Sequence, residues 1–295
     1  MGDMPPNRRN FLKLSVYATA LGLLNGCHSA SYQMLGQGRQ KNRPIRKNLR
    51  VLSFNIANAR GNNDYLFNPP RKETVIYNLD WIAELIRHYD IDVACMNEVD
   101  FNSIRTHGID MPGYIARALD YGHIIREKMF DFPSILEMGN AVVSRLPLRL
   151  NEYRQYGQGF VSRARHIFKS FVDFYVRLDD SGRTLNLVLT HLDHHNENIR
   201  CAEVDILREH LKGKNHPFVL MGDLNATPES KCFKRLVADN LVGNPDLGIP
   251  TYPPDNPYKA IDHILVSSGL KIENYHTVSM EASDHLPIMA DIILD

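Results

Sequence analysis

The chain has 295 residues, of which 43% are hydrophobic, and its formal net charge is +0 at pH 7. A hydrophobic fraction of this size supports a substantial core and argues against a disordered chain. The balanced charge lacks the basic surplus typical of proteins that hold duplex DNA, although a local basic face is still compatible with it.

The first 27 residues have the pattern of an export signal. Arg8 and Arg9 precede a short apolar run that ends at Cys27, which is the order of a twin-arginine lipoprotein signal. The run is too short to span a membrane. We therefore expect export to the cell envelope, cleavage before Cys27, and membrane attachment through a lipid on that cysteine. An ordinary N-terminal helix is the competing interpretation.

Residues 28–48 are polar and basic, and we interpret them as a flexible tether. The remaining cysteines lack the spacing of zinc-binding or redox motifs. Cys95 lies in an apolar run, which is typical of a small buried thiol. Because Cys95, Cys201 and Cys232 form an odd set, we do not expect a full disulfide framework.

Residues 49–295 are expected to form one catalytic domain with alternating strands and helices. Apolar residues that recur every two residues indicate strands, and apolar residues that recur every 3.6 residues indicate helices. Strands are predicted at 49–56, 92–99, 139–144, 170–178, 184–191, 217–221, 261–266 and 286–293. Helices are predicted at 73–89, 197–211 and 229–238. Hairpins are frequent, so the sequence favours an α/β fold of two mixed sheets packed face to face, with helices outside.

Acidic, amide and histidine residues follow or open many of these strands. Polar groups gathered at sheet ends are where α/β folds build their sites. The residues in such positions are Asn55, Glu98, His191, Asp223, Asn225, Asp262 and His285, with Asp284 beside the last. Each alone is weak evidence, because a single aspartate before a turn is usually a turn residue.

The chemistry of this set is coherent. Carboxylate and amide oxygens are the ligands of Mg²⁺, with Mn²⁺ as a second possibility. A histidine paired with a carboxylate is how an imidazole is oriented for proton transfer. Metal, base and amide donors together favour the attack of water on a phosphate.

Seven segments in this order resemble the endonuclease/exonuclease/phosphatase superfamily, the fold of deoxyribonuclease I, AP endonucleases, sphingomyelinases and inositol phosphatases. The carrying segments are Ser53-Phe54-Asn55-Ile56, Asn97-Glu98-Val99-Asp100, Gly139-Asn140-Ala141-Val142-Val143-Ser144-Arg145, Thr190-His191-Leu192, Gly222-Asp223-Leu224-Asn225, Ile261-Asp262-His263-Ile264-Leu265 and Ser283-Asp284-His285-Leu286-Pro287. The resemblance implies a four-layer α-β-β-α sandwich with the site at one edge of the two sheets.

The resemblance also implies roles for the metal and water side of the site. Glu98 would be the main metal ligand, with Asn55 beside it and Asp284 completing that side. Asp223 would orient or deprotonate the attacking water. His285, held by Asp262, would be the base or the transition-state partner.

Other roles concern the phosphate. Asn225 would contact the phosphate or the metal, and His191 would bond a phosphate oxygen or the leaving group. Asn140, grouped with the substrate-binding residues, would fix the local hydrogen-bond network. Arg105 and Arg200 are further candidates to meet substrate phosphate, against the alternative of surface arginines.

Two departures from the AP endonuclease pattern narrow the resemblance. Ala57 stands where those enzymes have an acidic residue, and His191 stands where they have a tyrosine. Both features favour the deoxyribonuclease, sphingomyelinase and phosphatase branches. Asn97 replaces the usual glutamine of the Gln-Glu motif and keeps an amide.

Residues 154–169 combine basic and aromatic side chains, which can grip a polyanion, but an exposed loop and hairpin is the favoured interpretation. His194 and His195 are likewise interpreted as a solvated loop. The sequence thus predicts a monomeric, metal-dependent hydrolase of phosphate esters, most simply a phosphodiesterase of nucleic acid, phospholipid head groups or small diesters. The alternatives are a phosphomonoesterase of the same fold, a surface binding protein without catalysis, and a hydrolase of other esters. The absence of HExxH and GxSxG motifs argues against the last.

Overall fold

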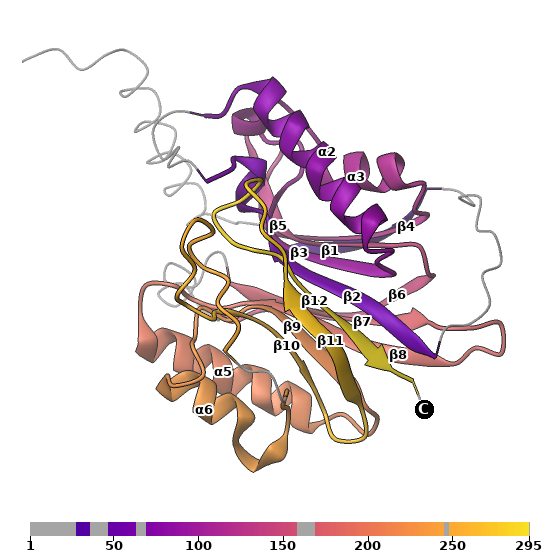
Figure 1. Ribbon diagram of the computed structural model, residues 1–295, viewed down its shortest axis with the longest axis vertical. Helices are drawn as coiled ribbons and strands as arrows, with labels where there is room; N and C mark the ends of the chain where they lie inside the picture. The colour runs from indigo at the N-terminus through magenta and orange to yellow at the C-terminus, as the bar shows by residue number, and fades with distance from the viewer. Residues whose placement is uncertain (1–27, 36–46, 63–68, 158–168, 245–247, 295) are drawn as a thin grey trace, which may run out of the picture.

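The computed structural model describes residues 28–35, 47–62, 69–157, 169–244 and 248–294. The export signal predicted for residues 1–27, including Cys27, lies outside these ranges. Two β-sheets pack face to face, and helices cover the outer face of each (Figure 1). The predicted four-layer α-β-β-α sandwich is therefore confirmed.

The larger sheet has seven strands in the described residues, in the order β1-β4-β5-β3-β2-β12-β11. β2 and β3 are parallel, and the other neighbouring pairs are antiparallel. The strands are β1 (Ser29–Met34), β2 (Asn48–Asn55), β3 (Val93–Asp100), β4 (His123–Phe132), β5 (Leu136–Ser144), β11 (Lys271–Thr277) and β12 (Ile288–Ile293).

The smaller sheet has five strands in the same described ranges, in the order β10-β9-β8-β7-β6. Only β8 and β9 are parallel among its neighbours. Its strands are β6 (Leu148–Gln155), β7 (Ser170–Arg177), β8 (Thr184–His191), β9 (Phe218–Asp223) and β10 (Asp262–Val266). Both sheets are mixed, as the hairpins in the sequence predict.

Helices complete the outer layers. α2 (Lys72–His88) and α3 (Met111–Leu119) cover the larger sheet, and α5 (Glu197–Lys212) and α6 (Lys231–Val237) cover the smaller one (Figure 1). The described residues also contain three short 3-10 helices, η1 (Ala57–Ala59), η2 (Ile104–Thr106) and η3 (Ala238–Asn240). No helix in the described part of the chain combines the length and apolarity needed to cross a bilayer.

Side-chain alternation along the strands separates three cores. In β2, Leu49 and Val51 face the other sheet, whereas Leu52 and Phe54 pack beneath α2 and α3. A third core joins the smaller sheet to α5 and α6. Successive residues of a strand point to opposite faces of the sheet. A polar residue two positions after the last apolar residue that faces the other sheet therefore lies at the end of the core between the sheets.

The tether predicted for residues 28–48 is wrong in part. Ser29–Met34 forms β1, an edge strand antiparallel to β4, and β2 already begins at Asn48. His28 Nε2 lies 2.8 Å from Glu127 Oε1, and Tyr32 Oη lies 2.7 Å from His123 Nδ1. The polar composition of this segment favours a tether, but an edge strand packs only one of its faces and can therefore be polar on the other.

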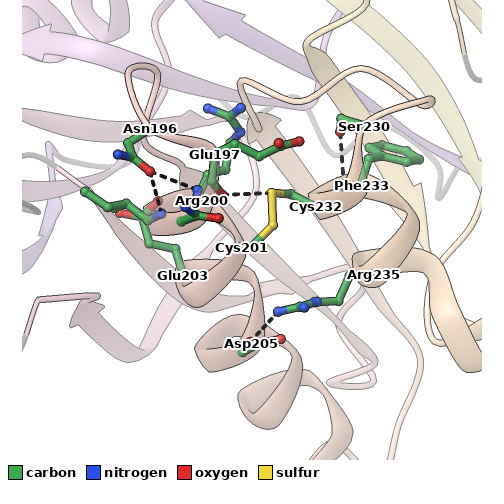
Figure 2. Close-up of a disulfide and its surroundings, with 12 residues drawn as sticks. Asn196, Glu197, Arg200, Cys201, Glu203, Asp205, Ser230, Cys232, Phe233 and Arg235 are labelled. Carbon is green, nitrogen blue, oxygen red and sulfur yellow. Dashed lines mark hydrogen bonds and ion pairs between the residues drawn. A yellow bond between two sulfur atoms is a disulfide. The ribbon is translucent and has the colours of Figure 1, made fainter.

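Cys201 of α5 and Cys232 of α6 form a disulfide (Figure 2). The spacing of 31 residues gave no sign of this pair, because it depends on how the two helices pack. Asn196 caps α5 and Ser230 caps α6 at the ends nearest the disulfide (Figure 2). Cys95 is buried and reduced, as its apolar surroundings predict.

Candidate active site

Five polar residues lie at one end of the sandwich, on the side of their strands that faces the other sheet. They are Asn55, Asn97, His191, Asp223 and Asp262. Asn55 pairs in register with Asn97, and Asp223 lies between His191 and Asp262 on its two neighbouring strands. All five have at most a few per cent of their surface exposed. The strand periodicity that places Val51, Val219 or Leu189 in the core thus places these polar groups just beyond it.

Asp223 is the centre of this group. Its Oδ2 accepts a hydrogen bond from Asn55 Nδ2 at 3.0 Å, and lies 3.4 Å from His191 Nε2 and 3.9 Å from His285 Nε2. Burial raises the pKa of this carboxyl, but the close contact with His191 and the charges of His285 and Lys169 lower it more, well below its usual range. Asp223 is therefore an anion that faces two imidazole rings.

His285 and Asp262 form a buried pair. His285 Nδ1 lies 2.8 Å from Asp262 Oδ2, and the same oxygen accepts from Thr251 Oγ1 at 2.6 Å. Burial lowers the pKa of His285, but the carboxylate of Asp262 outweighs it and brings the pKa to about 10. His285 is consequently a cation at neutral pH, with Nδ1 fixed by Asp262 and Nε2 directed toward Asp223.

Ser283 ties the loop that carries His285 to the end of β2. Its hydroxyl donates to the carbonyl of Asn55 at 2.6 Å and accepts from the backbone N–H of His285 at 3.2 Å. The ring of Tyr252 also packs against His285, with centroids 5.1 Å apart. Ser283 thus holds the backbone of His285, while Asp262 and Tyr252 hold its ring, which is what a preorganised catalytic group needs.

Glu98 lies at a β-bulge. The register of β3 against β5 shifts between Met96 and Val99, and Glu98 has a φ of 52°. A bulge re-aims a side chain, and a left-handed backbone at a residue other than glycine is a strained conformation common at functional sites. Here it turns Glu98 toward the end of the sandwich, where its side chain is 28% exposed.

The environment of Glu98 keeps it ionised. Its Oε1 accepts from Asn55 Nδ2 at 3.2 Å and lies 3.9 Å from His191 Nε2. Burial raises its pKa, but His191 and Lys169 lower it more, to about 2. The amide of Asn55 thus lies between two carboxylates, those of Glu98 and Asp223. A pair of ionised carboxylates with an amide beside them is an oxygen-rich donor set that fits a hard divalent cation.

A second group with metal-binding geometry consists of Asp223, Asp262 and His285, whose ligand atoms lie within 4.8 Å of one another. In this group Asp262 and His285 already bind each other. Among the described residues Glu98 has no ion pair shorter than its 3.9 Å separation from His191 Nε2, and it is the more exposed carboxylate. The donor chemistry therefore favours Glu98 as the residue that holds a metal. Asn55 directs its Nδ2 at Glu98 and Asp223, and its Oδ1, the atom that could bind a metal, also accepts from the N–H of Ala57 at 3.0 Å.

The predicted metal ligand Asp284 has a cation of its own. Its Oδ2 accepts from Arg60 Nη2 at 2.6 Å, and both side chains are 25% exposed. A metal at Asp284 would compete with this ion pair. Sequence analysis missed Arg60, because it follows an irregular turn after β2 and its partner is over two hundred residues away.

Asn97 connects the two sheets beneath the site. Its Oδ1 accepts from the backbone N–H of Asp223 at 3.0 Å, and its Nδ2 donates to Asn140 Oδ1 at 2.7 Å and to the carbonyl of Thr190. Asn140 in turn donates to Glu127 Oε2 at 2.7 Å. Asn97 thereby fixes the backbone at Asp223.

Asn140 does not lie on the surface of the site. Its side chain is fully buried and both of its polar atoms are bonded to Asn97 and Glu127. The hydrogen-bond network expected of Asn140 is present, and its assignment to substrate binding stays a prediction. The network continues through Glu127 to His28, the first described residue.

Two more predicted residues lie near the carboxylates of the site: Asn225 is bonded to Asp223, and Arg105 lies near Glu98. Asn225 has a φ of 48°, its N–H donates to Asp223 Oδ1 at 2.9 Å, and its Nδ2 donates to the carbonyl of Leu192. Arg105 makes a bidentate ion pair with Asp100 and donates to Asn58 Oδ1 at 2.8 Å. Burial lowers the pKa of Arg105, but the carboxylates of Asp100 and Glu98 raise it above its usual value. Arg105 is 30% exposed, so part of its guanidinium faces solvent.

Arg200 lies on α5 beside the disulfide (Figure 2). Its Nη1 donates to the carbonyl of Asp193 at 2.7 Å, and its Nε is buried. The structure thus shows Arg200 holding the loop after β8, and the predicted contact with substrate stays a prediction. His194 in that loop is exposed; partial burial and the charge of Lys169 lower its pKa to about 4.

Lys169 was not among the predicted site residues. It directly precedes β7, it is 5% exposed, and its Nζ lies 2.5 Å from His191 Nε2. The only signal in the sequence was its place at the end of the basic and aromatic stretch 154–169, which was interpreted as exposed. Residues 158–168 lie outside the described residues, so that interpretation is not tested for them.

Comparisons with known proteins agree with this fold. The model of the endonuclease/exonuclease/phosphatase family matches residues 52–285. A family protein from Bacteroides thetaiotaomicron has a similar structure, with a TM-score of 0.67, 16% identity, and coverage of 84% of this chain and 98% of that one. A mannosyl-6-phosphatase from the same species gives a TM-score of 0.66 at 17% identity and covers 83% and 99%.

More distant structures share the same architecture. The catalytic domain of human Nocturnin, with bound sulfate, gives a TM-score of 0.55 at 17% identity and covers 89% of this chain and 97% of that one. Comparison with curated proteins gave no match. Fold and site together define a hydrolase of phosphate esters. The chain belongs to the endonuclease/exonuclease/phosphatase family.

Proposed function

We propose that the protein is a metal-dependent phosphodiesterase. The observation that carries this proposal is the arrangement around Asp223: an anionic carboxylate faces His285, which is held by Asp262, and Glu98 with Asn55 lies at the same sheet end. An acceptor for the proton of water, a cation for developing charge and an oxygen-donor site for a metal are what attack on a phosphate requires.

The residues divide the work as follows. Asp223 accepts a hydrogen bond from the attacking water and takes its proton. His285 is already a cation at neutral pH, so it stabilises the negative charge that develops on the phosphate oxygens; the base role considered for it is disfavoured. Asp262 and Thr251 hold His285 in place. Asn225 and Arg105 are positioned at the rim to contact phosphate oxygens.

The proposed metal is Mg²⁺, with Mn²⁺ as the alternative, held by Glu98 and Asn55. When bound, such an ion neutralises charge on the phosphate and polarises its phosphorus–oxygen bonds. Asp284 would join this side of the site only if it left Arg60.

The preference for diesters comes from His191. A histidine at this position matches the diester-cleaving branches that the sequence resembles, and its ring lies 3.4 Å from Asp223. The structural similarity to a mannosyl-6-phosphatase supports the second candidate, a phosphomonoesterase of the same fold. Nucleic acid, phospholipid head groups and small diesters are the candidate substrates.

We also propose that the mature protein is an exported monomeric lipoprotein of the cell envelope, anchored to a membrane through Cys27. The order of basic pair, apolar run and cysteine supports this. The Cys201–Cys232 disulfide is a second support, because disulfides persist mainly in oxidising compartments outside the cytosol.

A substrate panel tests the proposed activity. The protein starting at His28, which retains β1, is assayed on a chromogenic phosphodiester, a chromogenic phosphomonoester, plasmid DNA and sphingomyelin, each with Mg²⁺, with Mn²⁺ and with EDTA. We expect metal-dependent turnover of a diester that His285→Ala abolishes and that His216→Ala, at an exposed histidine bonded to Tyr175, leaves unchanged. Turnover of monoesters alone would support the second candidate, and no turnover by a folded protein would favour a binding protein without catalysis.

A further inference from the structure

Lys169 is a buried cation at the proposed active site. Burial lowers the pKa of its ammonium below the usual value, and the carboxylates of Glu98, Asp223, Glu203 and Asp193 offset part of this shift by favouring the charged form. Its backbone is fixed, because Ser170 pairs in register with His191 and the carbonyl of Lys169 accepts from the N–H of Tyr156 at 3.2 Å. The side chain therefore reaches over the neighbouring strand to His191.

We propose that Lys169 positions His191 and supplies a fixed positive charge that binds the substrate phosphate on the β8 side of Asp223. This inference rests on the proposed phosphoesterase function and adds a residue to it. The resemblance assigns the contact with a phosphate oxygen or the leaving group to His191 alone. Here the positive charge next to the phosphate on the β8 side is that of Lys169.

The first argument is the way in which the ammonium and the imidazole meet. An ammonium group has donors and no acceptor, so its contact with His191 Nε2 requires the lone pair of that nitrogen. The remaining ring proton then lies on Nδ1, which is buried and has no partner among the described residues. No carboxylate in the described residues holds Nδ1 of His191 as Asp262 holds Nδ1 of His285. At Nε2 the ammonium of Lys169, at 2.5 Å, is nearer than the carboxylate of Asp223, at 3.4 Å, so Lys169 is the group that orients the ring.

The second argument is that no direct ion pair joins Lys169 to a carboxylate within the described residues. A buried lysine that serves only stability is normally paired in direct contact, as Lys214 is with Asp173 at 2.5 Å. Around Lys169 the carboxylates act from a distance, and the atom in contact is His191 Nε2, which accepts the hydrogen bond of the ammonium. Its charge is thus available to an anion that enters the site.

The third argument concerns the charge that a phosphate meets. Glu98 and Asp223 are both ionised and both lie within 4 Å of His191 Nε2, so they repel an anion at this position. A fixed cation among them reduces that repulsion, and its effect is large because the surroundings are buried. His285 serves the β10 side of Asp223 in the same way.

Phosphate binding tests this inference without any need for turnover. The dissociation constant of inorganic phosphate is measured calorimetrically, with Mg²⁺ present, for the unsubstituted protein, Lys169→Met and Lys169→Arg. We expect Lys169→Met to weaken binding at least tenfold and Lys169→Arg to stay within threefold. The matched control is Lys214→Met, at a buried lysine paired with Asp173, which should lower stability and leave phosphate binding unchanged.

A second measurement covers the case in which Lys169→Met does not fold. In the unsubstituted protein, nitrogen NMR of the His191 ring should show the proton on Nδ1, with His191→Gln used for assignment. A proton on Nε2 alone would overturn the inference, as would phosphate binding by folded Lys169→Met within twofold of the unsubstituted protein. If phosphate binds and depends on Lys169 while no ester is hydrolysed, the proposed function fails and this inference stands as a phosphate-binding site.

Discussion

Two histidines flank the same carboxylate in this site and have partners of opposite charge. His285 is held by the carboxylate of Asp262, whereas His191 is held by the ammonium of Lys169. The carboxylate keeps His285 protonated, and the ammonium takes the lone pair of His191. Residue type alone therefore does not assign a role to a catalytic histidine; the charge of its partner does. Asp223, between them, is the group that both sides share.

The largest effect should come from removing the shared carboxylate. We expect Asp223→Asn to lower kcat/KM for the preferred diester by about 10⁴-fold, because the acceptor for the proton of water and the anion facing both rings are lost together. Initial rates with Mg²⁺ measure this. A loss below tenfold in a folded protein would mean that the two histidines do not work through Asp223.

The substitution Asp262→Asn removes the carboxylate that holds His285, so that His285, like His191, no longer has a carboxylate bonded to Nδ1. We expect kcat to fall by about 10²- to 10³-fold. In the unsubstituted protein the His285 cation is present at neutral pH and is lost as the pH rises through about 10. The alkaline limit of kcat should therefore move to lower pH in Asp262→Asn. An unchanged pH profile would contradict the assignment of His285 as a cation.

The scaffold under the His191 side can be weakened without touching either histidine. The disulfide closes a loop of 31 residues, so replacing Cys201 and Cys232 by serine should lower the free energy of unfolding by roughly 3 to 4 kcal/mol. Chemical denaturation measures this, and kcat/KM at low temperature should change less than threefold. A large loss of activity at full stability would show that the disulfide positions the loop held by Arg200.

Asp173 offers a smaller test on the same side of the molecule. It is buried on β7 and is bound by His210 and Lys214, and although burial raises its pKa, these partners bring the pKa to about 2. Its pKa is depressed, so its contribution is present above pH 3.8 and is lost as the pH falls through 2. Asp173→Asn should lower unfolding stability at pH 7 by about 2 kcal/mol. Equal stability of the two proteins at pH 7 would contradict this.

Much of the site could be predicted because strand periodicity fixes it. Asn55, Asp223 and Asp262 occupy the inter-sheet face of their strands, so an apolar strand followed by a polar residue already places that residue at the sheet end. The fold class follows from the same alternation. The partner of each group was also predictable where it lies in a recognisable motif, as with Asp262 and His285.

Partners that depend on packing were not predictable. Lys169 belongs to a stretch with the composition of an exposed loop, and only the pairing of β7 with β8 brings it to His191. Arg60 reaches Asp284 from the far end of the sequence in the same way. β1 was hidden by its polar composition, since an edge strand with one packed face has a weak periodic signal.

The protonation of His285 tests the central comparison most directly. Nitrogen NMR of the His285 ring, assigned with His285→Gln, can be followed from pH 6 to pH 11 in the metal-free protein. We predict that both ring nitrogens carry protons at pH 8 and that the ring titrates near pH 10. In Asp262→Asn the titration should fall by several pH units. A His285 ring that is neutral at pH 8 in the unsubstituted protein would contradict the account, because the two histidines would then not differ in charge.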